Sequence, residues 1–255
     1  MSKLPMITAL FWIMKILATT LGETGGDLVA QTLNVGYLGS SLLFIALFAI
    51  SLVAQLRVKK FHPALFWAVI LATSTAGTTM SDFMNRTAGL GYANGALVLI
   101  ACLAIVFIIW RRSGQTFNVE QIRTFRGEVL YWVATLISNT LGTSTGDFLA
   151  HNTGLGFVAS TVIITAALVL IVAAHYLTPI SATLLFWGAY VLTRPFGANA
   201  GNTLSKTHDE GGLGLGTMGA SGVLAALLVG LVVYQTLTRR RQTRELVPAG
   251  DDLAR

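Results

Sequence analysis

The segments LGETGGD (residues 21–27) and LGTSTGD (residues 141–147) are near copies of each other and lie 120 residues apart. Each of them begins nine residues after a tryptophan. Two more divergent copies begin at the same distance after later tryptophans, AGTTMSD (residues 76–82) after Trp67 and FGANAGN (residues 196–202) after Trp187. The chain therefore contains four copies of one unit.

An aromatic residue precedes the tryptophan in every unit, in the pairs Phe11-Trp12, Phe66-Trp67, Tyr131-Trp132 and Phe186-Trp187. The tryptophans are 55, 65 and 55 residues apart, so the first two units map onto the last two, which indicates two successive duplications. Each unit holds two long apolar runs, so all four units enter a membrane with the same orientation. The repeats are therefore parallel rather than inverted.

The composition predicts that these units lie in a lipid bilayer. Hydrophobic residues make up 54% of the 255 residues and charged residues 11%, whereas a soluble domain carries about 25% charged residues. This excludes an ordinary soluble enzyme and a nucleic-acid-binding module, although the net charge is +6. Each crossing needs about 20 apolar residues. Eight runs qualify, residues 5–26, 36–56, 63–83, 91–110, 129–149, 156–175, 180–203 and 215–237.

The positive charges predict the orientation of these runs. Most Lys and Arg residues lie before the first run, after the eighth, between runs two and three, or between runs four and five. The opposite loops hold only Arg86 and Lys206. Because short cytoplasmic loops are enriched in Lys and Arg, we expect both termini in the cytoplasm and a multi-pass protein of the inner (cytoplasmic) membrane.

The sequence thus predicts an all-α membrane protein with eight transmembrane helices from four parallel two-helix repeats. We expect a first repeat pair in residues 1–110, a cytoplasmic linker in 111–128, a second repeat pair in 129–237 and an irregular cytoplasmic tail in 238–255. The single cysteine, Cys102, excludes an internal disulfide framework.

These features resemble a bacterial integral-membrane family of four tandem two-helix repeats, each with a tryptophan, that is described as a repeat of unknown function. The similarity covers residues 5–237 and rests on the aromatic–Trp pairs, on LGETGGD and LGTSTGD, and on TRPFGANAGN (residues 193–202). The second unit departs most from the pattern. The resemblance implies an integral membrane protein and supplies no activity.

Small residues recur at two positions of each unit. Ten residues after the tryptophan stand Gly22, Gly77, Gly142 and Gly197, and fourteen residues after it stand Gly26, Ser81, Gly146 and Gly201. Positions four apart lie on one helix face, and small residues there let two helix backbones approach closely. We therefore expect these residues to pack helices.

Oxygen-bearing side chains recur eight, twelve and fifteen residues after each tryptophan, on one helical face. The set is Thr20, Thr24 and Asp27, then Thr75, Thr79 and Asp82, then Thr140, Ser144 and Asp147, then Pro195, Asn199 and Asn202. Carboxylate, hydroxyl and amide oxygens suit hard cations or protons. If the first helices of the units gather around one axis, this stripe is predicted to line a cation pathway. The alternative is that the aspartates lie at the outer boundary and cap a helix or loop.

The charges inside the predicted spans do not balance. The carboxylates are Glu23, Asp27, Asp82 and Asp147, and the bases are Lys15 and Arg194. A charge near the middle of the bilayer costs roughly 2.5–3.5 kcal/mol on insertion scales, so such residues are functional hypotheses by default. Two carboxylates are left over and are expected to be protonated, hydrated or bound to a cation; a metal ion would use these four carboxylates.

The two bases inside the spans are predicted to be internal counter-ions that release carboxylates when a cation or proton arrives. Lys15 stands two helical turns before Glu23, on a similar face, so a stretched or water-bridged pair is one arrangement, and Arg194 precedes Pro195 in the seventh run. The alternative is that both bases form fixed structural salt bridges.

No feature of the sequence predicts an enzyme. The motifs HExxH and GxxxxGK[ST] are absent, and no cofactor is expected other than a transported metal ion. The last outer loop is three residues longer than its counterparts and contains His208, Asp209 and Glu210, which either capture a metal ion or form a plain solvated loop. The oligomeric state is left open.

We therefore favour a multi-pass secondary transporter of a small cation, with a divalent metal ion or a proton-coupled solute as the substrate. Asymmetric repeats within one chain fit a transporter better than a symmetric pore. The alternatives are a passive cation channel along the fourfold pseudo-axis, and a non-transporting membrane scaffold or sensor in which the glycines and aspartates only pack helices.

Overall fold

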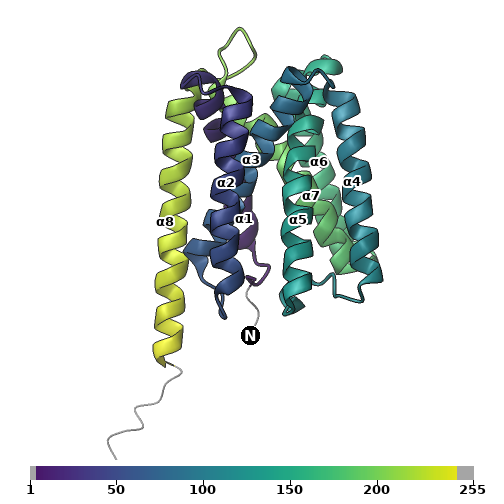
Figure 1. Ribbon diagram of the computed structural model, residues 1–255, viewed down its shortest axis with the longest axis vertical. Coiled ribbons are helices and arrows are strands. Elements are labelled where there is room, and N and C mark those ends of the chain that lie inside the picture. Colours follow the sequence, from purple (N-terminus) through teal and green to yellow (C-terminus); the bar gives the residue numbers. More distant parts are fainter. Residues whose placement is uncertain (1–3, 246–255) are drawn as a thin grey trace, which may run out of the picture.

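The computed structural model describes residues 4–245, and this part of the chain folds into eight long α helices joined by turns (Figure 1). The helices are α1 (Ala9–Asp27), α2 (Gly36–Arg57), α3 (Pro63–Asp82), α4 (Tyr92–Arg112), α5 (Phe125–Asp147), α6 (Gly156–Leu177), α7 (Ala182–Ser205) and α8 (Gly216–Glu245). At about 1.5 Å per residue, helices of this length span roughly the 30 Å of a hydrocarbon core. The predicted all-α fold of four two-helix repeats is confirmed.

The odd-numbered helices form a closed inner ring. Helix α1 packs against α3, α3 against α5, α5 against α7, and α7 returns to α1. The even-numbered helices lie outside this ring, and each covers the first helix of the following unit: α2 covers α3, α4 covers α5, α6 covers α7, and α8 covers α1. This exchange of second helices joins the four repeats into one circular assembly.

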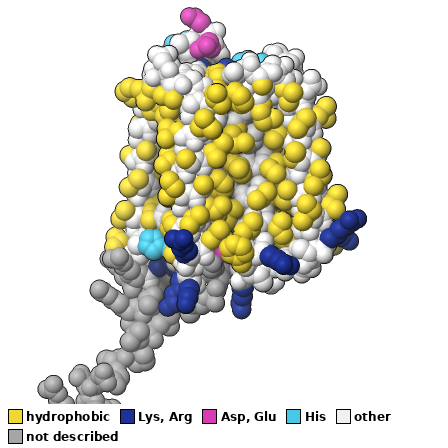
Figure 2. Space-filling view, viewed as in Figure 1, with side chains coloured by type: hydrophobic (Ala, Val, Ile, Leu, Met, Phe, Trp, Pro, Cys, Tyr) yellow, Lys and Arg dark blue, Asp and Glu magenta, His cyan; other side chains and the backbone are white. Residues whose placement is uncertain are grey.

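Inner and outer helices differ in hydropathy, as this arrangement requires. Within residues 4–245, five helical segments are long and apolar enough by composition to cross a membrane: α2, α4, α6, α8, and α3 extended to Thr87. Helices α1, α5 and α7 are more polar, because they bury many polar side chains within the bundle. The outer helices expose apolar side chains instead, and Figure 2 shows a broad apolar band with Lys and Arg gathered at its lower edge.

The recurring glycines confirm the predicted close packing of helices. The glycine ten residues after each tryptophan lies against the residue seven after the tryptophan of the next unit, in the pairs Gly22–Ser74, Gly77–Asn139, Gly142–Arg194 and Gly197–Thr19. A Cβ atom on Gly77 would lie 2.8 Å from the backbone carbonyl carbon of Asn139 and 2.9 Å from the backbone nitrogen of Thr140. The backbones of neighbouring inner helices therefore touch at this level.

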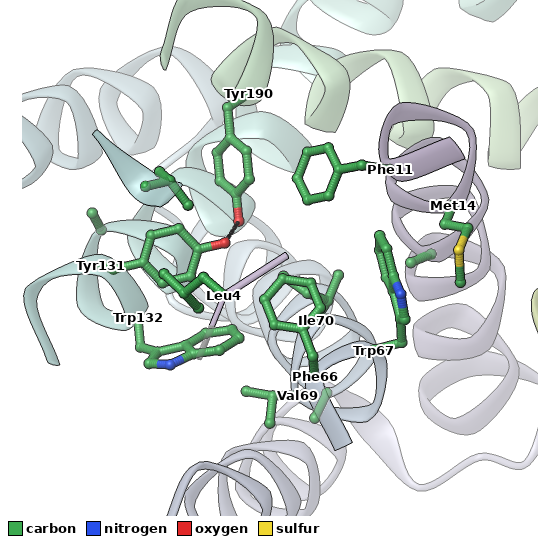
Figure 3. Close-up of a cluster of buried hydrophobic side chains, with 14 of the residues drawn as sticks. Leu4, Phe11, Met14, Phe66, Trp67, Val69, Ile70, Tyr131, Trp132 and Tyr190 are labelled. Carbon is green, nitrogen blue, oxygen red and sulfur yellow. Dashed lines mark hydrogen bonds between the residues drawn. The ribbon is translucent and has the colours of Figure 1, made fainter. Parts of the chain in front are cut away.

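Aromatic side chains fill the tryptophan end of the ring. The aromatic residue of each unit packs on the tryptophan of the next, with centroid distances of 5.8 Å for Phe11–Trp67, 5.7 Å for Phe66–Trp132, 6.2 Å for Tyr131–Trp187 and 5.6 Å for Phe186–Trp12. Figure 3 shows three of these aromatic residues together with Tyr190 and Leu4 in one cluster. Tyr190 and Leu4 are at most 3% exposed. This end of the axis is therefore packed rather than open.

The two ends of the described chain lie at the same end of the bundle (Figure 1). Helix α8 continues through Glu245, so residues 238–245 are helical and the expectation of an irregular tail is wrong for them. The rest of the predicted tail, residues 246–255, lies outside the described residues. Between α4 and α5, a short 3₁₀ turn (Val119–Gln121) buries Val119 against the core.

Candidate functional site

Buried side chains of all four units meet inside the inner ring, in layers one helical turn apart. They stand three, seven and eleven residues after each tryptophan and are all 2% exposed or less. The layers are Lys15, Ile70, Thr135 and Tyr190, then Thr19, Ser74, Asn139 and Arg194, then Glu23, Thr78, Thr143 and Ala198. Positions four apart share a helix face, which explains the layering. Each layer carries one charged residue.

Glu23 of α1 bonds to the other three inner helices. Its Oε2 accepts hydrogen bonds from the hydroxyls of Thr78 in α3 (3.0 Å) and Thr143 in α5 (3.4 Å). Its Oε1 accepts one from Asn202 Nδ2 in α7 (3.2 Å). The guanidinium of Arg194, also in α7, lies 3.4 Å from Oε2. One carboxylate therefore joins all four repeats.

Arg194 is fully buried, and its guanidinium contacts the other three units. It donates to the backbone carbonyls of Thr19 and Ser74, both at 3.1 Å, and to the two threonine hydroxyls that also hold Glu23. An unpaired charge in this position would be strongly destabilising, so the partners explain how an arginine stands inside the ring. Arg194, which the sequence predicts to be an internal counter-ion, thus pairs with the carboxylate of Glu23.

Lys15 contacts a tyrosine ring rather than Glu23, the partner considered from the sequence. Its ammonium lies 4.2 Å from the centroid of the Tyr190 ring, and no acceptor within residues 4–245 bonds to it. The Tyr190 hydroxyl lies 3.1 Å from both the Tyr131 hydroxyl and Thr135 Oγ1. A cation–π contact therefore holds the amine. No direct Lys15–Glu23 pair forms in the described part of the chain.

The three repeated aspartates lie far along their helices from the tryptophans, and each is 3% exposed or less. Asp27 accepts a hydrogen bond from Gln31 Nε2 (2.6 Å) and pairs with Lys206 Nζ (3.2 Å). Asp82 pairs with Arg86 Nε at 3.0 Å. These residues end the inner helices on the side opposite the aromatic cluster. We call the set Asp27, Asp82, Asp147 and Asn202 the acidic layer.

Asp147 is the least compensated carboxylate of the acidic layer. Its neighbouring cation is Arg86, whose Nη2 lies 3.8 Å from Oδ2, while the Nε of the same guanidinium faces Asp82. No group in residues 4–245 donates a hydrogen bond to either oxygen of Asp147. Its side chain is 1% exposed. A carboxylate in such a place is costly to keep charged unless a cation or a donor reaches it.

Arg86 and Lys206 correct the charge count made from the sequence. Both were assigned to outer loops, but their side chains fold back over the acidic layer, with 36% and 17% of the side chain exposed. Arg194, Lys206 and Arg86 therefore face the carboxylates Glu23, Asp27, Asp82 and Asp147, so the conclusion that two of these carboxylates are left over is wrong. The pairing is still unequal, because Lys15 contacts a tyrosine ring and Asp147 shares Arg86 with Asp82.

Most hydroxyls of the predicted pathway lie away from the axis. Five of them bond to carbonyl oxygens of their own helices, namely Thr20, Thr24, Thr75, Thr79 and Thr140. Thr24 bonds to Ser221 of α8, and Ser144 bonds to Ser81 of α3. Asn199 is buried, and its amide has no bonded partner within the described range. The position eleven after each tryptophan faces inward, and the position twelve is rotated about 100° from it, toward a neighbouring helix.

A π-helical turn follows each aspartate directly. The turns are Leu28–Thr32 after Asp27, Phe83–Thr87 after Asp82, and Phe148–Asn152 after Asp147. In the fourth unit Asn202 replaces the aspartate, and α7 continues as a regular helix to Ser205. Such turns are rare and often mark functional sites. Here they place Gln31 and Arg86, each four residues after an aspartate, against that carboxylate.

A pocket of about 290 Å³ lies just outside the acidic layer. It is lined by Arg86, His151, Phe157, Lys206 and Glu210. Partial burial, and then the charge of Arg86, lower the pKa of His151. Arg86 and Lys206 each contact this pocket and an aspartate, so the two bases lie between the pocket and the acidic layer.

The long outer loop forms a turn that its own bonds hold. His208 Nδ1 lies 2.9 Å from the carbonyl oxygen of Gly212, and the Glu210 carboxylate accepts hydrogen bonds from the backbone nitrogen and hydroxyl of Thr207. Over residues 4–245, no three His, Cys, Asp or Glu side chains are arranged to hold a metal ion. The carboxylates suggested as metal ligands are therefore not gathered into one ligand set; these are Glu23, Asp27, Asp82 and Asp147.

Residues 142–146 read GTSTG and match the letters of a nucleophile elbow. They lie inside α5, however, whereas that motif requires a sharp turn between a strand and a helix. The match therefore carries no catalytic meaning.

The sequence interpretation missed the inward-facing hydroxyls of Thr78 and Thr143 and the two bases over the acidic layer. A signal for the hydroxyls was present. The asymmetric charges Lys15, Glu23 and Arg194 stand three, eleven and seven residues after their tryptophans, positions four apart that define the inner face.

A family model described as Repeat of Unknown Function (DUF347) matches the chain at residues 10–61, 65–116, 130–181 and 185–241. Each match covers one inner helix and the outer helix that follows it. Neither a curated protein nor a solved structure matches the chain. Because the four matches together span most of the 255 residues, the chain belongs to the family described as Repeat of Unknown Function (DUF347).

Proposed function

We propose that this protein is a proton-coupled transporter of a small cation, and that the acidic layer is where protons and the cation exchange. The apolar outer helices and the polar inner ring make it a membrane protein with a polar interior. Ionisable groups held inside a membrane bundle are typical of proton relays and ion pathways.

The observation that carries the proposal is the sharing of Arg86 by two buried carboxylates. Arg86 Nε lies 3.0 Å from Asp82, and Nη2 lies 3.8 Å from Asp147, which has no hydrogen-bond donor in residues 4–245. One positive charge does not neutralise two carboxylates in a medium of low polarity. A proton or a cation therefore completes the pair, and exchanging one for the other is the proposed coupling step.

The packed axis favours a transporter over a passive channel. Beyond the acidic layer, the Glu23–Arg194 pair and its threonine partners occupy the middle of the ring, and the aromatic cluster fills the far end. The pocket at Arg86 and Lys206 gives access from one side. A carrier that opens each side in turn is compatible with such a closed arrangement, with the Glu23–Arg194 pair as the inner barrier.

Charge favours placing the termini in the cytoplasm and the protein in the inner membrane. Lys and Arg gather at the lower edge of the apolar band (Figure 2), where the described chain ends also lie (Figure 1). Basic residues are enriched on the cytoplasmic side. The acidic layer then faces the opposite side, and the cation meets Arg86 and Lys206 on entry.

The cation that exchanges with protons is proposed to be monovalent rather than a divalent metal ion. A Ca²⁺ or transition-metal site usually gathers several carboxylate, histidine or thiolate ligands. In the part of the chain that the structure describes, no such group of three occurs.

The experiment that tests this function is proton flux in proteoliposomes. Purified protein is reconstituted with a pH-sensitive dye inside, and a membrane potential or a gradient of Na⁺ or K⁺ is imposed. The wild type should move protons in response, and Asp147→Asn should lose most of the flux while it reconstitutes normally. Asp209→Asn, the same change on an exposed loop residue, is the matched control and should keep full flux.

A scaffold role has one observation in its favour, because the Glu23–Arg194 network joins all four repeats as a packing device would. The same assay separates the two functions. A scaffold predicts no flux above protein-free vesicles in the wild type, and Asp147→Asn then changes only thermal stability.

A further inference from the structure

In three of the four units, the repeated tryptophan is buried. Gln235 of α8 accepts a hydrogen bond from Trp67 Nε1 (3.0 Å), and the Trp110 ring of α4 packs on Trp187 with a centroid distance of 5.4 Å. Gln55, 55 residues before Trp110, is also fully buried, near the end of α2. The residue that covers Trp67 or Trp187 therefore comes from the C-terminal part of an outer helix.

The unit of Trp12 lacks this cover. His175 of α6 stands 120 residues after Gln55 and so occupies the equivalent position, but it is exposed, and Trp12 is only partly buried. Both residues line a pocket of about 820 Å³ bounded by α1, α6, α7 and residues 117–120. We call it the Trp12 pocket. Its volume is that of a site for a drug-sized molecule.

The Trp12 pocket combines aromatic rings with one carboxylate. Trp12, Phe117, Tyr176 and Phe186 line it, and the rings of Trp12 and Phe186 lie 5.6 Å apart. Glu120 is the one Asp, Glu, Lys or Arg residue among the lining residues that the structure describes. Its Oε1 accepts a hydrogen bond from the Ile7 backbone nitrogen (2.7 Å), which fixes the carboxylate at the pocket.

We propose that the Trp12 pocket binds an amphipathic organic cation that enters from the lipid. Aromatic faces attract cations, and the carboxylate of Glu120 adds an opposite charge with no basic Lys or Arg beside it in the described lining. The apolar remainder of the wall accommodates the hydrocarbon part of such a molecule. A lipid phosphate is a poorer match, because the fixed charge of the pocket is negative. This site is distinct from the acidic layer, and its binding does not depend on the proposed transport.

The test is binding of tetraphenylphosphonium to the full chain in detergent, measured by calorimetry and by quenching of tryptophan fluorescence. The uncharged triphenylphosphine oxide and the anion tetraphenylborate serve as ligand controls and should bind at least tenfold more weakly. Glu120→Gln should weaken phosphonium binding by about fivefold, the effect of losing roughly 1 kcal/mol of charge attraction at an exposed carboxylate. Asp209→Asn should bind like the wild type.

A second variant separates pocket filling from misfolding. His175→Trp copies the arrangement in which Trp110 covers Trp187, and should fill the pocket. It should abolish phosphonium binding without lowering thermal stability. Wild-type affinity in both Glu120→Gln and His175→Trp, or equal binding of the cation and its uncharged analogue, would overturn the proposal and indicate a pocket that holds only membrane lipid.

Discussion

Replacing Glu23 by glutamine should destabilise the protein strongly, because the change leaves the guanidinium of Arg194 charged and without its carboxylate. Both side chains are 3% exposed or less, and their closest atoms lie 3.4 Å apart. Removing one partner of a buried ion pair typically costs about 3–5 kcal/mol. For a chain of this size, each kcal/mol shifts the unfolding temperature by roughly 2–4 °C. We therefore expect Glu23→Gln to lower the melting temperature by roughly 10 °C.

The assay is thermal unfolding in detergent, followed by circular dichroism, for Glu23→Gln, Arg194→Gln and the double variant. Because the double variant leaves no unpaired charge, it should be more stable than the sum of the two single losses predicts. Asp209→Asn is the exposed control and should change stability by no more than about 0.5 kcal/mol. A melting temperature for Glu23→Gln close to that of the wild type, or strictly additive losses, would refute the placement of this pair at the centre of the ring.

Three further outcomes are expected. Gly77→Ala should cost about 1–3 kcal/mol, because the new methyl group meets the backbone of Asn139. Gly219→Ala, in α8 with open space around it, should not lower stability in the same unfolding assay and should raise it by up to about 1 kcal/mol. Lys206→Gln removes the base that pairs with Asp27, so the cation concentration for half-maximal flux in proteoliposomes should fall several-fold; an unchanged value would count against competition between this base and the substrate. The hydrogen bonds from Thr207 lower the pKa of Glu210. The charged carboxylate therefore stabilises the turn at pH values above the ordinary carboxyl pKa, and this stabilisation is lost as the pH falls through the lowered pKa. Hydrogen exchange of the Thr207 amide should show this loss in the wild type and not in Glu210→Gln.

The repeat pattern made the helices predictable, because hydropathy and the spacing of tryptophans are local properties of the chain. The role of the glycines was predictable for the same reason, since four-residue spacing places small residues on one helix face. Hydropathy does not say which neighbour an apolar face meets. The packing of each outer helix on the following unit could therefore not be read from the sequence.

The candidate site was predictable only in part. The burial of Asp27, Asp82 and Asp147 was expected, whereas the return of Arg86 and Lys206 toward them was not. For Arg86 the reason is the π-helical turn after Asp82, a local widening of the helix that has no simple sequence signature. The predicted hydroxyls stand eight and twelve residues after each tryptophan, one residue beyond the inward-facing positions seven and eleven. A single residue is a rotation of about 100°, enough to turn Ser144 from the axis to a contact with Ser81.

Proton exchange at Asp147 is the central claim, and difference infrared spectroscopy of the protein in lipid bilayers tests it most directly. Spectra recorded over a series of pH values should contain a carboxylic-acid band that rises and falls reversibly, and this band should be missing from Asp147→Asn. If the spectra of the two proteins change with pH in the same way, Asp147 takes up no proton, and the acidic layer is a packing element.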